Sequence, residues 1–581
     1  MKTVAVLGAS YGGSRAAQVL AAQLPNNWRV VMVDRNTHMN HLYVLPRYAV
    51  IPGHEHKAFI PYTDILKHGS TSLRHIYLHA QVTSINDRYI SLSKPFPEHG
   101  IYGPDPKLEF DYVVYALGSH LPAPINLWGP VGDEADAELE GLKQQETSPE
   151  VDPVAKCEDH RSIPCPTSSL TPIVRGTKPG GIAWLRRFRE RLEHASSVLV
   201  VGGGALGVQY ATDIAEVFPT KHATLLHSRS QLLPRFDEAM HDEILSSLSG
   251  FNITTILGER LDLSWHGEDA KSNERVVRTL SGREIRAEVV TPNTALLKDF
   301  LPDCLVPEGT SKGMVRVKRT LQIAVPVTTP TVSATSSDVD SSTIPSTDST
   351  TLIDTPSSSD DETTLEIRRT FQELAFSSVN SDDSDSVSDL DLGSGDALDN
   401  QVEAQSTKEH ETEEQDEVGE EDEEEEEEDG DDHLQVVHPN MFAIGDAADS
   451  FGAINAGHNA YFQADVAAKN ILKLIRQDEL TSQASTCTPP TLSDNEALSE
   501  DGELQQQESN TSSGDADLGN VWELAKYRPG PPAIKVSLGL RKSLFQFNGV
   551  VGTKTDVAED LDAGLLWKFY GADASEEGMY A

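Results

Sequence analysis

The stretch SSVLVVGGGALGVQYATDIAEVFP, residues 196–219, holds the clearest pattern in the chain. Its apolar run predicts a buried strand, and the glycines Gly202, Gly204 and Gly207 then lead into a predicted helix. In the G-x-G-x-x-G pattern the first glycine allows a tight turn, the second lets a pyrophosphate approach the backbone, and the third packs the helix on the strand. Free N–H groups at the helix N-terminus favour a phosphate. The stretch therefore predicts a dinucleotide-binding unit.

The strand that follows this helix ends without an acidic residue. It reads HATLLHSR, residues 222–229, and ends in His227, Ser228 and Arg229. NAD-binding units often carry an acid here for the ribose 2′-hydroxyl, whereas a nearby cation accommodates the 2′-phosphate of NADPH. We therefore favour NADPH over NADH. The alternative, in which Arg229 is an ordinary exposed arginine and either nucleotide binds, stays open at this point.

A looser copy of the same unit stands at the start of the chain. The stretch VAVLGASYGGSRAAQVLAAQL, residues 4–24, again predicts strand, glycine turn and helix, but a serine takes the place of the middle glycine. The next strand, WRVVMVDR, ends in an acid that can accept a ribose hydroxyl. Two such units predict two nucleotide sites, although a glycine turn in an unrelated α/β sheet is the alternative for this one. Its candidate binding residues are Gly8, Ala9, Ser10, Tyr11, Gly12, Gly13, Asp34 and Arg35.

Two further predicted strands end in a glycine followed by a small polar or acidic residue. The first, YVVYALGSHLPAP, residues 112–124, contains Gly118, and the second, PNMFAIGDAAD, residues 439–449, contains Asp446. Each motif is weak alone, but their order along the chain is specific. It runs glycine-rich turn, A-x-G-S, glycine-rich turn, VVTPNTALL and A-x-G-D.

This order resembles that of the flavoprotein oxidoreductases with two dinucleotide-binding domains. In finer detail the chain is similar to the apoptosis-inducing-factor-like branch, which includes the ferroptosis-suppressor-type quinone reductases and their fungal relatives. The finer resemblance rests on NHLYVLPRYAVIPGHEHKAFIPY, residues 40–62, on ATLLHSRSQLLPRF, residues 223–236, and on NMFAIGDAAD, residues 440–449.

The resemblance implies an α/β fold with two Rossmann-like domains and a small C-terminal α+β interface domain. An inserted NAD(P) domain would split the FAD domain. Segments rich in Ser, Thr, Pro and acids bury too little apolar surface to fold, so we expect them to be disordered. We place the FAD domain at 1–131, 304–324 and 433–476, the NAD(P) domain at 182–303, the interface domain at 521–581 and disordered segments at 132–180, 325–432 and 477–520.

The resemblance also assigns roles to single residues. The first glycine turn and Asp34 match the FAD phosphate and ribose positions, and Arg47 matches an FAD-contacting arginine. Val82 matches a backbone contact to adenine, and Asp446 matches the carboxylate that takes a ribityl hydroxyl. The second glycine turn matches the NAD(P) site.

These roles imply an FAD-dependent NAD(P)H oxidoreductase. Hydride would pass from the nicotinamide to flavin N5, with no side chain needed as acid or base, and electrons would go on to a quinone-like acceptor. Three departures bear on that acceptor. Relatives often carry Glu where this chain has Gln209, they often carry a lysine soon after Gly-Asp, and disulfide reductases need a CxxxxC pair that this sequence lacks. A flavin monooxygenase and a non-catalytic sensor of the NAD(P)H state remain alternatives.

Composition narrows the class of partner. The net charge of −45 argues against an electrostatic grip on nucleic acid or anionic lipid. Of the 92 acidic residues, 35 lie between residues 325 and 434, where they could attract basic partners. The four cysteines form no CxxC pair, and the chain enters a strand without a signal peptide. We therefore expect a cytoplasmic location, with peripheral membrane or mitochondrial contact and a homodimer left open.

Overall fold

The structure is a computed structural model. It describes residues 1–62, 65–66, 74–119, 175–262, 275–287, 289–292, 314–327, 433–486 and 523–580. Most of the three segments expected to be disordered, and all four cysteines, lie outside these residues.

A five-stranded parallel sheet in the order β19-β9-β1-β2-β5 forms the centre of the first domain. Buried apolar residues fill β1 and β2, as expected for a parallel sheet that is covered on both faces. The edge strand β19 comes from the far end of the chain and pairs with β9, so this domain is built from two separated segments. The strands are β1 Lys2–Leu7, β2 Trp28–Asp34, β5 Ile76–His79, β9 Tyr112–Tyr115 and β19 Met441–Ala443.

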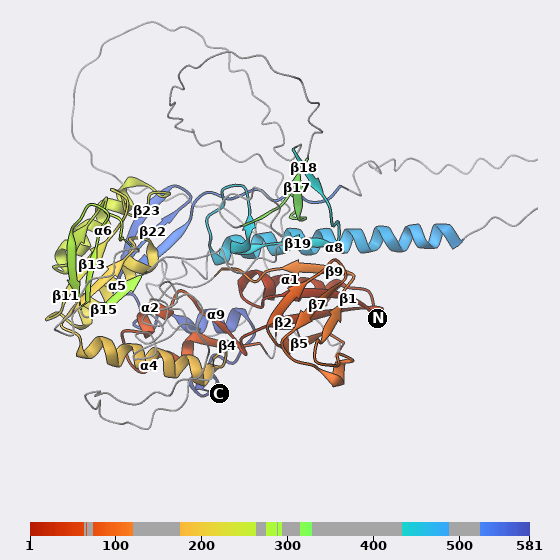
Figure 1. Ribbon diagram of the computed structural model, residues 1–581, viewed down its shortest axis with the longest axis horizontal. Coiled ribbons are helices and arrows are strands. Elements are labelled where there is room, and N and C mark those ends of the chain that lie inside the picture. Colours follow the sequence, from red (N-terminus) through yellow and green to blue (C-terminus); the bar gives the residue numbers. More distant parts are fainter. Residues whose placement is uncertain are drawn as a thin grey trace, which may run out of the picture.

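Helices α1, Tyr11–Gln23, and α8, Gly457–Thr486, pack along each other against this sheet (Figure 1). α8 continues past Gln477, where disorder was expected to begin. Its extension includes the good helix formers Glu479, Leu480 and Ala484, and the hydroxyl of Tyr112 donates to Oδ2 of Asp478 at 3.2 Å. Helix propensity and this anchor therefore carry the helix further than composition indicated.

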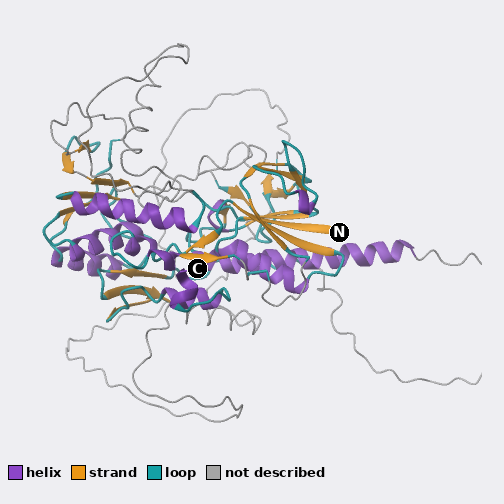
Figure 2. Ribbon diagram, turned by 90° about the horizontal axis from the view of Figure 1, so that it is seen from below, coloured by secondary structure: helices purple, strands orange, loops and turns teal. Residues whose placement is uncertain are grey.

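The second domain contains a four-stranded parallel sheet in the order β12-β11-β10-β15. Figure 2 shows its helices stacked beside its strands, which confirms the expected second Rossmann-like unit. The elements are α4 Lys178–His194, β10 Ser197–Val201, α5 Ala205–Val217, β11 His222–Leu226, α6 Glu238–Gly250, β12 Thr254–Ile256, the hairpin of β13 Arg275–Arg278 and β14 Glu284–Ala287, and β15 Val289–Pro292.

The C-terminal part is an antiparallel three-stranded sheet followed by two short helices, which agrees with the expected α+β class. It packs against α5 and shares a hydrophobic core with the second domain and with α2 of the first. Its elements are β21 Ile534–Ser537, β22 Lys542–Phe547, β23 Val550–Thr555, α9 Ala563–Phe569 and α10 Glu576–Tyr580.

Small ribbons and turns complete the first domain. They are β3 His38–Asn40 with β4 Phe59–Pro61, β6 Val82–Ile85 with β7 Tyr89–Leu92 and β8 Lys107–Glu109, β16 Val315–Arg316 with β20 Ala448–Asp449, β17 Ala324–Pro326 with β18 Leu434–Val436, and the helical turns α2 Leu45–Tyr48, η1 Glu55–Ala58, η2 Pro97–His99 and η5 Gly445–Ala447.

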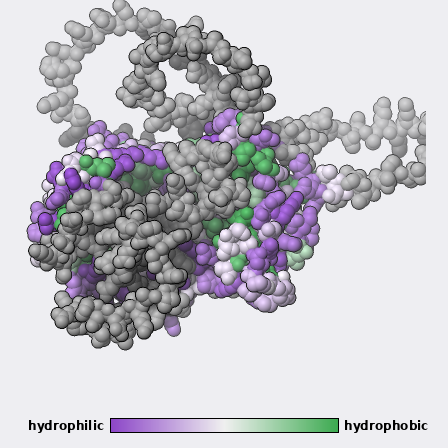
Figure 3. All heavy atoms as spheres, viewed as in Figure 1, coloured by the Kyte–Doolittle hydropathy of each residue, from purple (hydrophilic) through white to green (hydrophobic). Residues whose placement is uncertain are grey.

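The antiparallel β17–β18 ribbon corrects one expected boundary. Disorder was expected from Val325, but this residue pairs with Gln435, and the ribbon continues as Val327 N–H donates to the carbonyl of His433 at 2.9 Å. Backbone pairing with the distant strand orders a stretch that composition alone leaves undecided. Figure 3 shows a small hydrophobic surface near this ribbon, where Val327 and Val437 are half exposed.

Two large hydrophobic clusters lie side by side. One surrounds the first sheet and α8, and the other joins α2, α4, α5 and the C-terminal sheet. Within the described part of the chain, no helix combines the length and the apolar character needed to cross a bilayer.

Candidate functional site

The first glycine turn is sterically closed around its glycines. Gly8 has a φ of +93°, and a Cβ at this position would lie 2.3 Å from the carbonyl oxygen of Ala116. A Cβ on Gly13 would lie 1.8 Å from the carbonyl oxygen of Gly8. Both positions therefore require glycine, and the turn brings the start of α1 directly onto the ends of β1 and β9.

The helices that follow the two glycine turns begin without a side-chain cap. The N-cap residue of α1, Ser10, accepts no hydrogen bond from its helix through its side chain, and the N-cap residue of α5, Gly204, has no side chain that could accept one. By contrast, Thr177 accepts from Gly180 N at the start of α4, and Asp237 accepts from Ala239 N at the start of α6. The first N–H groups of a helix need partners, and a phosphate supplies them. Both turns therefore fit the pyrophosphate of a dinucleotide.

Asp34 stands at the carboxyl end of β2, beside the first glycine turn. Its Oδ2 accepts from Ala9 N and its Oδ1 from Asn36 N, both at 2.7 Å. Burial raises the pKa of Asp34, while these hydrogen bonds and the charge of Arg35 oppose the shift. The remaining lone pairs of the carboxylate can accept ribose hydroxyls. The structure thus brings Asp34 and Arg35 to the predicted turn.

The A-x-G-S and A-x-G-D motifs meet at the ends of β9 and β19. The hydroxyl of Ser119 donates to Oδ2 of Asp446 at 3.0 Å. Gly118 and Gly445 both have positive φ, and Gly445 N donates to Oε1 of Gln463 at 2.7 Å. A pocket beside these groups is lined by Gly445, Asp446, Ala448, Ser450, Ala453, Ile454, Asn455, Ala456, Asn459, Ala460 and Gln463. Ser119 was not predicted, although it follows Gly118 within the quoted motif.

The second glycine turn is supported by a histidine. Gly202 has a φ of +113°, and Gly203 N–H donates to Nδ1 of His227 at 3.0 Å. Burial lowers the pKa of His227, so the ring that supports the turn is neutral. Gly207 lies in the first turn of α5, at its predicted place. Arg229 is exposed just beyond β11.

The acid that follows the neighbouring strand β12 is bound by the turn of the β13–β14 hairpin. The carboxylate of Glu259 accepts from Thr279 and Arg283 at 2.9 and 2.8 Å, and also from Ser281. These hydrogen bonds lower the pKa of Glu259. Its oxygens are therefore already engaged beside the end of β11.

Arg47 corrects a prediction that came from the resemblance. Its side chain has no exposed surface, and its Nε donates to Oδ2 of Asp213 in α5 at 2.9 Å. The other guanidinium nitrogens donate to the carbonyls of Gly539, Leu540 and Glu559. With all nitrogens engaged and no surface free, Arg47 joins three parts of the chain and does not line a cofactor groove.

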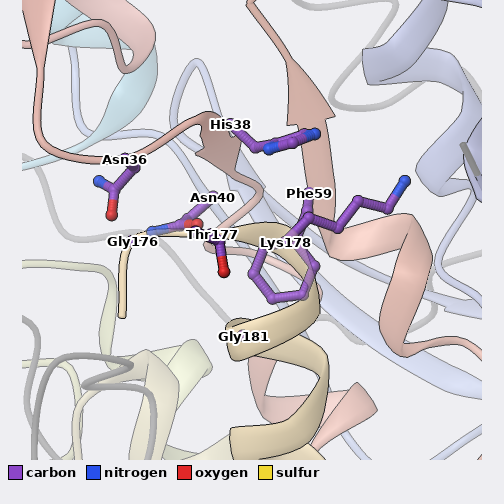
Figure 4. A pocket seen from close by; sticks show the side chains of 8 residues that line it. All are labelled: Asn36, His38, Asn40, Phe59, Gly176, Thr177, Lys178 and Gly181. Atoms are coloured by element: carbon purple, nitrogen blue, oxygen red, sulfur yellow. The ribbon is translucent and has the colours of Figure 1, made fainter. Parts of the chain in front are cut away.

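Val82 begins β6, which pairs with β7, and it is half-buried at the edge of the first domain. A pocket between the segment after Asp34 and the start of α4 is lined by Asn36, His38, Asn40, Phe59, Gly176, Thr177, Lys178 and Gly181. Figure 4 shows Lys178 extending away from Asn36 and Asn40. Its Nζ donates to the carbonyl of Met579 at 2.6 Å, so its charge does not serve this pocket.

A polar stripe on α5 was missed. Gln209, Asp213 and Glu216 lie on one face of the helix, at spacings of four and three residues. Gln209 Nε2 donates to Ser537 Oγ at 3.2 Å, and Glu216 Oε2 accepts from Leu540 N at 2.6 Å. The spacing of these polar residues in an otherwise apolar helix was the available signal. The stripe holds α5, the helix behind the second glycine turn, against the C-terminal sheet.

Comparison with known proteins agrees with this geometry. The family model described as pyridine nucleotide-disulphide oxidoreductase matches residues 2–294. The chain belongs to this family. Fe-regulated protein 8 of Mycosarcoma maydis is 31% identical to it, over 99% of this chain and 96% of that protein.

Other relatives are less similar to this chain, and their alignments cover about half of it. Apoptosis-inducing factor homolog B of Dictyostelium discoideum is 24% identical over 45% of this chain and 53% of its own length. Ferroptosis suppressor protein 1 of Taeniopygia guttata is 23% identical over 50% of this chain and 62% of its own length. The resemblance to the apoptosis-inducing-factor-like branch is thereby confirmed.

Membership makes the chain a pyridine nucleotide-dependent flavin oxidoreductase, and the family implies FAD and NAD(P)H as its nucleotides. The uncapped start of α1, Asp34 and Asp446 are the groups that would hold FAD. The uncapped start of α5 would hold the pyrophosphate of NAD(P)H.

Proposed function

We propose that the chain oxidises NAD(P)H, with NADPH preferred, and passes the electrons through FAD to a quinone-like acceptor. The observation that carries this proposal is the pair of uncapped helices, α1 and α5, each behind a glycine turn in its own parallel sheet. FAD, when bound, supplies the redox chemistry by accepting hydride and releasing electrons. The chain supplies the positions of the two nucleotides.

Two features bear on the electron acceptor: the absence of a CxxxxC pair and the residues that surround Asp446. No CxxxxC pair occurs in the sequence, so the chain lacks the motif by which disulfide reductases place a dithiol beside the flavin. This absence favours a small acceptor that approaches the flavin directly. Asp446 is the one charged residue lining its pocket, and Ser450, Asn455 and Asn459 are neutral. A lining with so little charge favours an uncharged acceptor, and a quinone is one that takes two electrons.

The positive charge of Arg229, just after the end of β11, favours NADPH. His227 occupies the end of this strand as a neutral ring, and the exposed Arg229 follows it. The carboxylate of Glu259, which follows the next strand, is bound by Thr279, Ser281 and Arg283 and so is held toward the β13–β14 hairpin. A positive site whose neighbouring acid is held by other residues favours a 2′-phosphate.

An anaerobic absorbance titration of the purified protein tests both points. Addition of NADPH should bleach the flavin spectrum faster than NADH does, and a soluble quinone should restore it. Arg229→Glu should lower the NADPH rate relative to the NADH rate by about tenfold, the scale of one charge-assisted contact. Arg278→Glu is the matched control, because Arg278 is an exposed arginine on the β13–β14 hairpin of the same domain.

The same titration, followed by admission of air, separates the alternatives. Flavin that stays oxidised although NAD(P)H binds tightly would indicate a nucleotide sensor. Reduced flavin that consumes oxygen only in the presence of an organic substrate, and gives an oxygenated product, would indicate a monooxygenase. Protein that holds no flavin and binds none would contradict the proposed function.

A further inference from the structure

The segment after the C-terminal sheet returns to the first domain. Trp567 in α9 donates from its indole nitrogen to the carbonyl of Lys57 at 2.9 Å, and α9 packs against η1. Trp567, Tyr570 and Met579 belong to the hydrophobic core around the first sheet. Figure 1 shows α9 near the centre of the molecule, although β21–β23 lie with the second domain. This segment therefore forms part of the first domain's own interior.

Tyr570 lies beside the first glycine turn. Tyr570 and Tyr62 belong to one buried hydrophobic cluster, and Tyr11, in the turn, packs against that cluster. The guanidinium of Arg15, in the first turns of α1, lies 4.6 Å from the ring centroid of Tyr461. The neighbouring Phe569 packs on Tyr461 of α8 with 5.7 Å between ring centroids. Tyr570 thus lies in the part of the core that borders the first glycine turn and the start of α1.

The hydroxyl of Tyr570 is a buried donor without a partner. The residue is 1% exposed, and its hydroxyl makes no hydrogen bond within the described part of the chain. Burial raises the pKa of Tyr570 well above its usual range, so the phenol keeps its proton. A buried polar group left unpaired is costly, and such groups are uncommon in native proteins. A bound acceptor would remove this cost.

We propose that Tyr570 is a positioning residue for FAD. The hydroxyl of Tyr570 would donate to an oxygen of the diphosphate–ribose part of the cofactor. The inference rests on the proposed function, because it needs FAD at the first glycine turn. The C-terminal segment then forms a wall of the FAD site that lies far outside the glycine motif in sequence. Phosphate and ribose oxygens are the acceptors that a neutral phenol near a helix N-terminus would meet.

The last helix fastens this wall to the first domain. The ring of Tyr580 stacks on His56 with 3.7 Å between centroids, and Glu576 lies 3.5 Å from Nζ of Lys57. The Nζ of Lys178 donates to the carbonyl of Met579 at 2.6 Å. These contacts hold the chain on the far side of Tyr570, so the helix α10 limits how freely the wall can move.

Tyr570→Phe tests the proposal because it removes only the hydroxyl. FAD titration into the apoprotein, followed by flavin fluorescence, should show a Kd raised about tenfold or more, the scale of a hydrogen bond to a charged acceptor. The apoprotein should keep its Tm, since no partner is lost. Tyr210→Phe is the matched control. Its hydroxyl is also buried and makes no hydrogen bond within the described chain, but it lies in α5, and its FAD Kd should match that of the wild type.

An unchanged Kd in Tyr570→Phe would overturn the inference while leaving the proposed function intact. A lower apoprotein Tm with an unchanged Kd would assign Tyr570 a purely structural role. Wild-type protein that binds no FAD would overturn the proposed function and this inference together. If Tyr570→Phe does not fold, Tyr580→Ala replaces it, since Tyr580 is 61% exposed. FAD should then dissociate several-fold faster from this variant. An unchanged dissociation rate would contradict the proposal that the C-terminal segment forms a wall of the FAD site.

Discussion

The hydroxyl of Ser119 donates a 3.0 Å hydrogen bond to Oδ2 of Asp446, although 327 residues separate the two. The strands that carry them, β9 and β19, are neighbours in one parallel sheet, with Val113 opposite Met441. The second domain and the acidic segment lie between them in sequence. The first domain is therefore complete only when the chain has returned from both, and the proposed FAD site depends on that return.

Replacement of Asp446 should weaken FAD binding with little effect on the apoprotein. Asp446→Asn removes a charged acceptor for a ribityl hydroxyl, and we expect the FAD Kd to rise about tenfold. Ser119→Ala should have a smaller effect, because it only frees the carboxylate from one donor. Fluorescence titration with FAD measures both. Asp105→Asn, at an exposed position, should bind FAD like the wild type. Equal Kd values for Asp446→Asn and the wild type would contradict the assigned role.

Replacement of Arg47 should destabilise the protein more at pH 8 than at pH 5. Arg47 and Asp213 are both fully buried, and burial raises the pKa of Asp213 to about 6 although Arg47 opposes the shift. Arg47→Met removes that opposition, so the folded pKa rises further. A carboxyl whose folded pKa is raised contributes stability at low pH and loses it as pH rises through that value. At pH 8 the loss in unfolding free energy should reach about 3–5 kcal/mol.

Urea denaturation of Arg47→Met at the two pH values measures this difference. The double variant Arg47→Met/Asp213→Leu is the control. It removes both charges, so its stability should depend less on pH and should exceed that of the single variant at pH 8. A loss from Arg47→Met that is the same at pH 5 and pH 8 would show that Asp213 does not change its charge in this range.

Excision of residues 328–432 should leave the fold and both nucleotide sites intact. The backbone of Val327 is hydrogen-bonded to His433, and the β17–β18 ribbon is antiparallel, so a two-residue Asn-Gly turn can join its ends. Shortening a loop lowers the entropy cost of closing it. The Tm should stay the same or rise, and the Kd values for FAD and NADPH should change by less than about twofold. A lower Tm or lost FAD binding would show that the excised segment contributes to the fold.

The sequence predicted those parts of the site that depend on local geometry. Gly8 and Gly202 lie in positive-φ turns, and the motifs ending in Gly118 and Asp446 meet as their order indicated. Local geometry is encoded in adjacent residues, so a motif can be recognised in one dimension.

Contacts between separate parts of the chain could not be predicted from the sequence. Arg47 was assigned to FAD, but its partners are Asp213 and three carbonyls of the C-terminal part. Tyr570 has no local motif, and only the packing of α9 brings it to the first turn. The limits of the disordered segments were also misplaced, because backbone pairing at Val325 and the anchor at Asp478 depend on distant residues.

Alanine substitutions at Gly203 and Gly204 should have different effects: the first on protein stability, the second on nucleotide binding at the second turn. The motif leaves position 203 open to any residue, but a Cβ there would lie 2.3 Å from Cδ2 of Leu232 and 2.9 Å from Cγ of His227. Gly204 has an ordinary φ of −79°, and a Cβ there would meet no described atom within 4 Å. Gly203→Ala should therefore lower the Tm of the apoprotein, whereas Gly204→Ala should leave it unchanged.

Gly204→Ala should nevertheless weaken NADPH binding about tenfold or more, because the second glycine of the pattern lets the pyrophosphate approach the backbone. Calorimetric titration with NADPH measures the Kd, and FAD binding at the first turn serves as the internal control, since it should not change in either variant. If Gly204→Ala bound NADPH as tightly as the wild type, the pyrophosphate would not lie at the start of α5, and the assignment of this turn to NAD(P)H would fail.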